Sequence, residues 1–170
     1  MEFGLRELPT EKMLQELASH YPEMNVIGIL AALRLLRFGA EFEKALDVYL
    51  SRHGISLSRF SVLMMLRRSG PEGLKPTELA EKTGVTRGNM TGLIDGLEKS
   101  KLIRRQDSPT DRRIVYIKLS PQGRAFLEKI LPDHLRRLSQ FMTRIGEAEL
   151  SKLSEDIEKL REGVSVITQE

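Results

Sequence analysis

The chain has 170 residues, of which 40% are hydrophobic and 30% charged, a composition typical of one globular domain with extensions. It contains no cysteine, which excludes disulfides, thiolate metal sites and cysteine-based redox sensing, and its three histidines lie far apart in the sequence, which disfavours a histidine metal site. No apolar run is long enough to span a bilayer and the first residues lack the apolar core of a signal peptide, so we expect a cytoplasmic protein without a membrane partner.

The net charge is only +3, but it is unevenly distributed along the chain. Residues 75–124 carry 11 Lys and Arg against 6 Asp and Glu, a local charge of +5, so the rest of the chain carries −2. A basic segment inside an otherwise acidic chain indicates contact with a polyanion, although a solvated charged surface would have the same composition.

A short amphipathic segment and one long helix are predicted in the first third of the chain. The segment TEKMLQELASH forms a short amphipathic piece that is closed by Tyr21-Pro22. A long helical pattern then runs from about Asn25 to Leu50, with Gly54 as a stop shortly after.

Two arginines, Arg34 and Arg37, stand in a largely apolar stretch of this long helix. Because a guanidinium fork matches a carboxylate, they are candidates for binding a small carboxylate effector. The residues assigned to this candidate effector site are Arg34, Arg37, Tyr49, His53 and Met65. Alternatively, the arginines pair with carboxylates of the same helix, namely Glu41, Glu43 and Asp47. For at least one arginine we favour the ion pair.

The next segment, SLSRFSVLMMLRRSG, predicts a helix that is apolar on most sides and therefore central in the core. Its expected core residues are Leu57, Phe60, Val62, Leu63, Met64 and Leu66. We interpret the two neighbouring methionines as flexible packing rather than as a ligand-binding group.

Three short elements follow in quick succession. PTELAEKTG predicts a helix with Pro76 in its first turn and Gly84 at its end. VTRGNMTGLIDGLEKSKL predicts the next helix, with Thr86 as N-cap. LIRRQ and RIVYIKLS predict two strands, which the turn-forming DSPTD joins into a hairpin.

The C-terminal third predicts two further helices. SPQGRAFLEKI opens the first, with Ser120 as N-cap, Pro121 at the first helical position, and Pro132 expected to kink or break it. The second starts near Gly146, and its apolar residues recur every three or four positions, as in a helix-packing seam. They are Leu150, Leu153, Ile157, Leu160 and Val164. An ordinary amphipathic helix packed within its own chain would show the same pattern.

Three glycines recur every four residues in the helix that Thr86 caps, at positions 88, 92 and 96. Each costs about 1 kcal/mol relative to alanine inside a helix. At 100° per residue they lie opposite Met90, Leu93, Ile94 and Leu97, the predicted buried face. We therefore expect all three to point outward and to leave a face that another surface, such as the DNA major groove, can approach closely. A loosely specified exposed helix is the alternative.

The order helix, Gly84 turn, outward-facing polar helix and hairpin predicts a winged helix-turn-helix, in a fold that is mainly α with a two-stranded β-wing. An arginine on the projecting turn can enter the minor groove, and Asp111 can hold the Arg113 guanidinium through a charge-assisted hydrogen bond. Base edges would be contacted by Arg87, Asn89 and Thr91. The predicted DNA-binding residues are Thr77, Thr86, Arg87, Gly88, Asn89, Thr91, Gly92, Arg105, Asp111, Arg112 and Arg113.

The phrases LEKSKLIRR, DSPTDRR and IKLSPQGR, in this order and spacing, resemble the multiple-antibiotic-resistance regulator (MarR) family of transcription regulators. The resemblance runs from about Ile29 to the C-terminus. It implies an obligate homodimer built from N- and C-terminal helices, and a recognition helix that reads double-stranded DNA at a pseudo-palindromic site. It also implies control by a small molecule, often an aromatic acid, without a cofactor. Asp111 and Arg113 match the family's wing Asp-x-Arg, with Arg112 beside them.

On this basis residues 1–24 are an N-terminal extension and residues 25–55 an N-terminal dimerisation helix. Residues 56–120 are the DNA-binding winged-helix lobe, and residues 121–170 are C-terminal dimerisation helices. The expected function is a transcriptional regulator, most simply a repressor relieved by an effector. The alternative is a winged-helix protein-interaction or dimerisation module that does not read DNA. An enzyme is disfavoured, because the sequence has no cysteine nucleophile, phosphate-cradling glycine loop or clustered His/Asp set.

Overall fold

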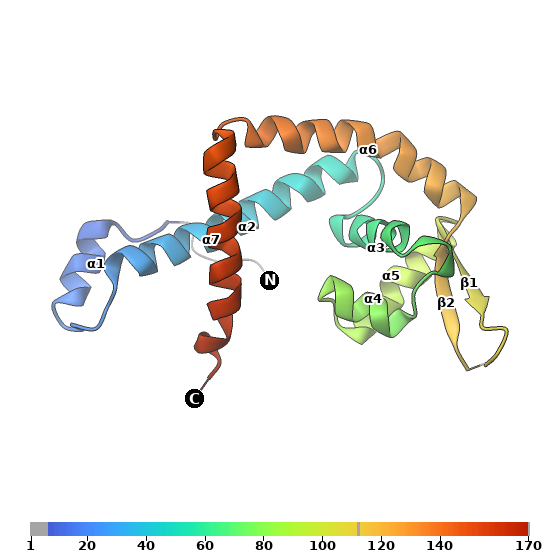
Figure 1. The fold of residues 1–170 in the computed structure, drawn as a ribbon, viewed down its shortest axis with the longest axis horizontal. Helices are drawn as coiled ribbons and strands as arrows, with labels where there is room; N and C mark the ends of the chain where they lie inside the picture. The colour runs from blue at the N-terminus through green and yellow to red at the C-terminus, as the bar shows by residue number, and fades with distance from the viewer. Residues whose placement is uncertain (1–6, 112, 170) are drawn as a thin grey trace. The chain divides into compact units, whose positions relative to one another are not determined.

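The computed structural model describes residues 7–111 and 113–169, and the chain divides after Ser120 into two compact units. The first unit opens with α1 (Glu11–Ala18) and the long helix α2 (Val26–Ser51), which pack against each other (Figure 1). Asn25 begins α2 as an N-cap, and its side chain accepts a hydrogen bond from the Gly28 N–H at 2.8 Å. The predicted long helix is confirmed, and the short amphipathic segment forms α1.

The winged-helix lobe, residues 56–120, continues the first unit with helices that lie beside a small sheet (Figure 1). Its helices are α3 (Leu57–Arg68), the 3₁₀ turn η1 (Gly70–Glu72), α4 (Pro76–Thr83) and α5 (Arg87–Lys99). Residues next to the helices determine where α4 ends and where α5 begins. Gly84 closes α4 with a left-handed φ of +68°, and the Thr86 side chain accepts a hydrogen bond from the Asn89 N–H at 3.4 Å.

The strands β1 (Ile103–Asp107) and β2 (Val115–Leu119) pair antiparallel, with Ile103 opposite Leu119 and Asp107 opposite Val115. Leu74 extends this pair, because it exchanges two backbone hydrogen bonds with Ile117, at 3.0 and 2.8 Å. The predicted fold class, a mainly helical protein with a two-stranded wing, is therefore confirmed.

Helix α3 supplies much of the core of the lobe: Phe60, Val62, Leu63 and Leu66 are buried. Leu57 and Met64, which were predicted to belong to the core, are only half-buried. At 100° per residue they lie about 120° and 100° around the helix from Leu63, on the flank of the buried face.

The second unit consists of α6 (Pro121–Met142), α7 (Glu147–Gly163) and the 3₁₀ turn η2 (Val164–Ile167). Helix α6 runs through Pro132 without interruption, so of the two outcomes expected at this proline the break is wrong. Proline removes the hydrogen bond to the carbonyl of Glu128, but that residue is exposed, and water can satisfy the freed carbonyl.

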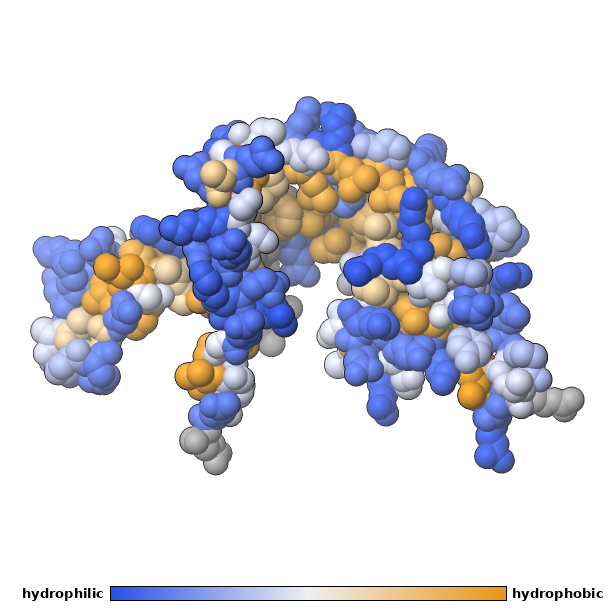
Figure 2. Space-filling model, in the orientation of Figure 1, coloured by the Kyte–Doolittle hydropathy of each residue, from blue (hydrophilic) through white to orange (hydrophobic). Residues whose placement is uncertain are grey.

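The surface differs in character between the lobe and the helices outside it. Figure 2 shows a mostly hydrophilic surface over the lobe, and hydrophobic patches over α1 and α2. Within the described residues, no helix combines the length and the apolar character needed to cross a membrane.

Candidate nucleic-acid interface

Helix α5 presents an exposed face on which two glycines leave the backbone bare. A Cβ atom built at Gly88 or at Gly92 would meet no other atom within 4 Å, and both residues are exposed. On the opposite side Met90, Ile94 and Leu97 are buried in the lobe, whereas Leu93, also predicted for the buried face, is only half-buried at its edge. The predicted outward direction of these two glycines is confirmed.

Gly96 differs from the other two glycines, and the prediction that all three point into open space is wrong for it. A Cβ atom built at Gly96 would lie 2.9 Å from Cζ of Arg59, which projects from α3. Gly96 lies about 40° further around the helix than Gly92, at the edge of the exposed face, where a side chain of a neighbouring helix can cover it.

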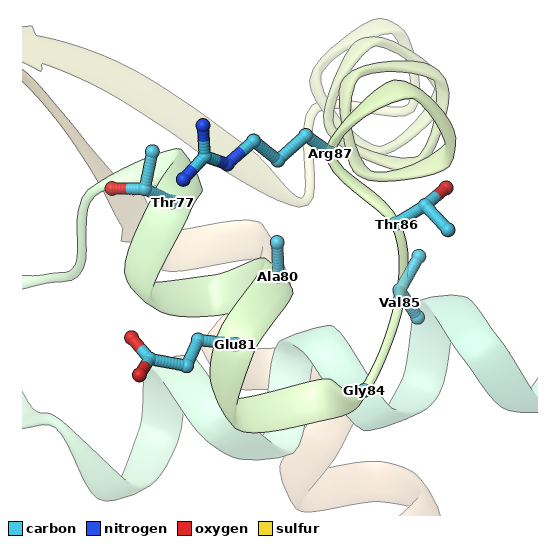
Figure 3. Close-up of a pocket in the computed structure, with 7 residues that line it drawn as sticks. All are labelled: Thr77, Ala80, Glu81, Gly84, Val85, Thr86 and Arg87. Atoms are coloured by element: carbon cyan, nitrogen blue, oxygen red, sulfur yellow. The ribbon is translucent and has the colours of Figure 1, made fainter.

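The polar residues predicted to read DNA surround the open glycines. Arg87, Asn89 and Thr91 are all exposed, and the Thr91 hydroxyl donates a hydrogen bond to the Arg87 carbonyl at 3.2 Å. Thr77 is exposed in the first turn of α4. In Figure 3 the Arg87 side chain extends from the start of α5 toward Thr77.

Between α4 and the start of α5 the surface is hollowed, and the hollow has a polar rim. It is lined by Thr77, Ala80, Glu81, Gly84, Val85, Thr86 and Arg87. Figure 3 shows the Glu81 carboxylate on the far side of α4 from the Thr86 hydroxyl. The hollow is thus lined by residues of α4, of the turn that follows it and of the start of α5.

The tip of the wing is organised by its own polar side chains. The Arg113 backbone N–H donates to Oδ1 of Asp111 at 2.9 Å, and the Ser108 hydroxyl accepts from the backbone N–H groups of Thr110 and Asp111. The sequence predicted that Asp111 holds the Arg113 guanidinium, whereas the structure shows it holding the backbone, as short acidic side chains commonly do in turns.

Arg113 is exposed, and no carboxylate within the described ranges lies within 4 Å of its guanidinium. Its charge is thus available to an outside partner at the tip of the wing. Arg112, the other predicted wing contact, lies outside the described residues.

Arg105 on β1 was predicted to bind DNA, but the structure places its guanidinium against α5. It forms ion pairs with Asp95 at 2.5 Å and with Glu98 at 3.0 Å, and its side chain is 43% exposed. Exposed ion pairs contribute about 0–1 kcal/mol each, so their main effect is to connect the wing to α5 and to offset part of the negative charge of two carboxylates on that helix.

The candidate effector residues do not form one cluster within the chain. Arg37 Nε lies 2.8 Å from Oε1 of Glu41, which confirms the ion pair favoured for at least one of the two arginines. Arg34 is exposed, and Met65 is half-buried on α3. The rings of Tyr49 and His53 meet edge to face with centroids 5.1 Å apart, but about 18 Å of helix separates Arg37 from Tyr49.

Outside the lobe, burial lowers the pKa of His134 on α6, and the nearby Asp133 carboxylate acts in the opposite direction. Among the residues that the structure describes, no group of three or more His, Asp or Glu side chains could hold a metal ion.

Comparisons with known proteins agree with this architecture. The profile of the MarR family matches residues 53–114. Over 162 residues the chain is 30% identical to the HTH-type transcriptional repressor YetL of Bacillus subtilis (strain 168), a match that covers 95% of this chain and 97% of that protein.

Solved structures show the same fold. The chain is similar to the crystal structure of Sco3205, a MarR family transcriptional regulator from Streptomyces coelicolor, in complex with DNA, with a TM-score of 0.76 and 26% identity over 83% of this chain and 89% of that chain. It also shares its fold with CouR from Rhodococcus jostii RHA1 bound to p-coumaroyl-CoA, with a TM-score of 0.66 and 22% identity over 76% of this chain and 90% of that chain.

Proposed function

Because the chain belongs to the MarR family of transcriptional regulators, we propose that it is a homodimeric repressor that binds a pseudo-palindromic DNA site and releases it when a small effector binds. The observation that carries the DNA-binding part is the exposed face of α5, where Gly88 and Gly92 leave the backbone open. A helix with so little bulk on one side can lie deep in the major groove.

The side chains around this face have the chemistry of base readers. An arginine such as Arg87 can donate two hydrogen bonds to guanine, and an asparagine such as Asn89 can pair with adenine. Arg113, at the tip of the wing, is suited to the narrow and electronegative minor groove. Thr77 and Thr86 have hydroxyl groups that suit phosphate oxygens.

Dimerisation is supported by apolar surface on the helices outside the lobe. On α7, Leu153, Ile157 and Leu160 are exposed, and no described residue of that helix is buried. On α2, Ile27 and Phe38 are 78% and 50% exposed. Exposed apolar side chains of this kind are unfavourable in water, and a second copy of the chain would cover them.

The effector is proposed to be a small carboxylate or aromatic molecule. CouR binds p-coumaroyl-CoA in the same fold, and Arg34 offers a guanidinium that makes no ion pair within the described part of this chain. Tyr49, His53 and Met65 are the other proposed contacts. Arg37 is the weaker candidate, because Glu41 already binds it.

A mobility-shift assay with genomic fragments, in the presence of excess unrelated DNA, tests the proposal. We expect retention of a fragment from near the protein's own gene, with an affinity that falls steeply as salt rises, since phosphate neutralisation drives such binding. Binding without sequence preference, or no binding, would favour a protein-interaction module instead.

A further inference from the structure

Arg59 occupies an unusual place against the recognition helix α5. It stands in the first turn of α3, where its backbone N–H donates to the Ser56 hydroxyl at 3.4 Å, while its guanidinium lies over Gly96. A Cβ atom at position 96 would be 2.9 Å from Cζ and 3.2 Å from Nε of Arg59. Any residue larger than glycine would therefore displace the guanidinium from this position.

The Arg59 guanidinium has no partner in the described ranges, where it makes neither an ion pair nor a side-chain hydrogen bond. The two carboxylates next to Gly96 along α5, Asp95 and Glu98, both bind Arg105 instead. Ordering a long side chain costs conformational entropy, and here no hydrogen bond within the chain offsets that cost.

The charge along α5 explains what such a cation could do. The helix carries its own basic residues only near its ends, at Arg87 and Lys99, while its C-terminal half carries Asp95 and Glu98. Carboxylates repel DNA phosphates, and Arg105 neutralises only one of their two charges. A second guanidinium, held half-exposed at Gly96, supplies the missing positive charge from a neighbouring helix.

We propose that Arg59 is a DNA-phosphate ligand that α3 supplies to the C-terminal half of the recognition helix, and that Gly96 is the space in which its guanidinium sits. This inference rests on the DNA-binding function proposed above. The glycines of α5 then have two roles. Gly88 and Gly92 leave space for DNA to approach the helix backbone, and Gly96 leaves space for the Arg59 guanidinium.

The first experiment compares Arg59→Gln with Arg68→Gln, which removes the same charge from the exposed C-terminal end of the same helix. We expect Arg59→Gln to weaken binding roughly three- to tenfold for operator and unrelated DNA alike, and to reduce the slope of log K against log salt by about 0.9, the value for one phosphate contact. Arg68→Gln should leave the slope unchanged. The same slope of log K against log salt in the two variants would overturn the proposal.

The second experiment uses Gly96→Ala to move Arg59 without removing it. The atoms in the way belong to the end of a flexible side chain, so the variant should fold, and circular dichroism checks this. We expect Gly96→Ala to lose as much affinity as Arg59→Gln, and the double variant to lose no more than either alone. A further loss in the double variant would show that Gly96 itself faces the DNA and would contradict the assigned role.

The failure of this inference is distinguishable from the failure of the proposed function. If the unmodified protein binds no DNA, the proposed function fails and the inference falls with it. If the unmodified protein binds its operator and Arg59→Gln does so with the same affinity and salt slope, only the inference is refuted. A merely structural Arg59 would lower the unfolding temperature without changing the slope.

Discussion

The winged-helix lobe and helix α7 place their apolar side chains in opposite ways. The lobe buries residues such as Leu63, Met90 and Ile117 almost completely within one chain, whereas α7 leaves Ile157 and Leu160 exposed. The lobe is thus a folded core with a polar, basic surface, and a polyanion suits it as a partner. The described part of α7 leaves apolar side chains exposed, and a second apolar surface suits them. Two surface chemistries within one chain fit the two partners proposed above, which are DNA and a second copy of the chain.

The largest expected effect is on the free energy of unfolding, because the lobe buries its core within one chain. Met90 is 1% exposed, so Met90→Ala should leave a cavity and lower the free energy of unfolding by about 2–5 kcal/mol. Met13 on α1 is 58% exposed, and Met13→Ala should change that free energy by no more than about 0.5 kcal/mol. Denaturant unfolding measures both. Similar losses in the two variants would show that the lobe core is assigned wrongly.

The uncovered face of α7 predicts an effect on association. Ile157→Lys places a charge in the proposed dimer seam and should weaken the dimer roughly tenfold or more, because an apolar interface leaves that charge unpaired. Glu155→Lys, on the other side of α7, serves as the control and should leave the dimer intact. Sedimentation at several concentrations measures the association. A fully folded unmodified protein that stays monomeric at micromolar concentration would contradict the proposed dimer.

The wing predicts an effect confined to DNA binding. Arg113→Ala should weaken operator binding by about 1–3 kcal/mol without changing the unfolding temperature, since it removes an exposed charge-assisted contact. Asp111→Ala should act more weakly, because it loosens the backbone that carries Arg113 but leaves the guanidinium in place. Fluorescence anisotropy with a labelled operator measures both losses. Unchanged affinity in both variants would argue against a wing that touches DNA.

The smallest effect concerns the buried His134 on α6. Its pKa is lowered in the folded state, so below pH 6.5, its ordinary pKa, the unfolded chain takes up a proton that the folded chain resists. Stability should therefore fall as the pH is lowered through this range, and His134→Gln should make that fall shallower. His20→Gln, at an exposed site after α1, is the control. Unfolding curves at several pH values measure how the free energy of unfolding depends on pH. The same dependence on pH in the unmodified protein and in both variants would refute the role assigned to His134.

The parts of the fold that depend on local signals could be predicted from the sequence. Gly84 and Thr86 mark the turn between α4 and α5 by backbone freedom and capping, and these requirements act within a few residues. The helical period of α5 is also a local property, and it correctly predicted that Met90 is buried in the lobe and Gly92 is exposed. The winged helix then follows from the order of the elements.

The parts that depend on contacts between distant residues could not be predicted. Arg105 binds carboxylates of α5 ten and seven positions earlier, and Arg59 reaches Gly96 from a helix 37 positions away. No periodicity or motif encodes which neighbour an exposed arginine will meet. The DNA contacts assigned to Arg87, Asn89 and Arg113 stay predictions, because they depend on a partner molecule.

Gly92→Leu, assayed for operator affinity and thermal unfolding together, tests the central claim that the open face of α5 is the DNA-binding surface. The added side chain has free space within the chain, and leucine favours the helix over glycine by roughly 0.5–1 kcal/mol, so the unfolding temperature should hold or rise. Specific operator binding should be lost, because the side chain would collide with base edges or phosphates. A folded Gly92→Leu variant that binds its operator with unchanged affinity would contradict the account.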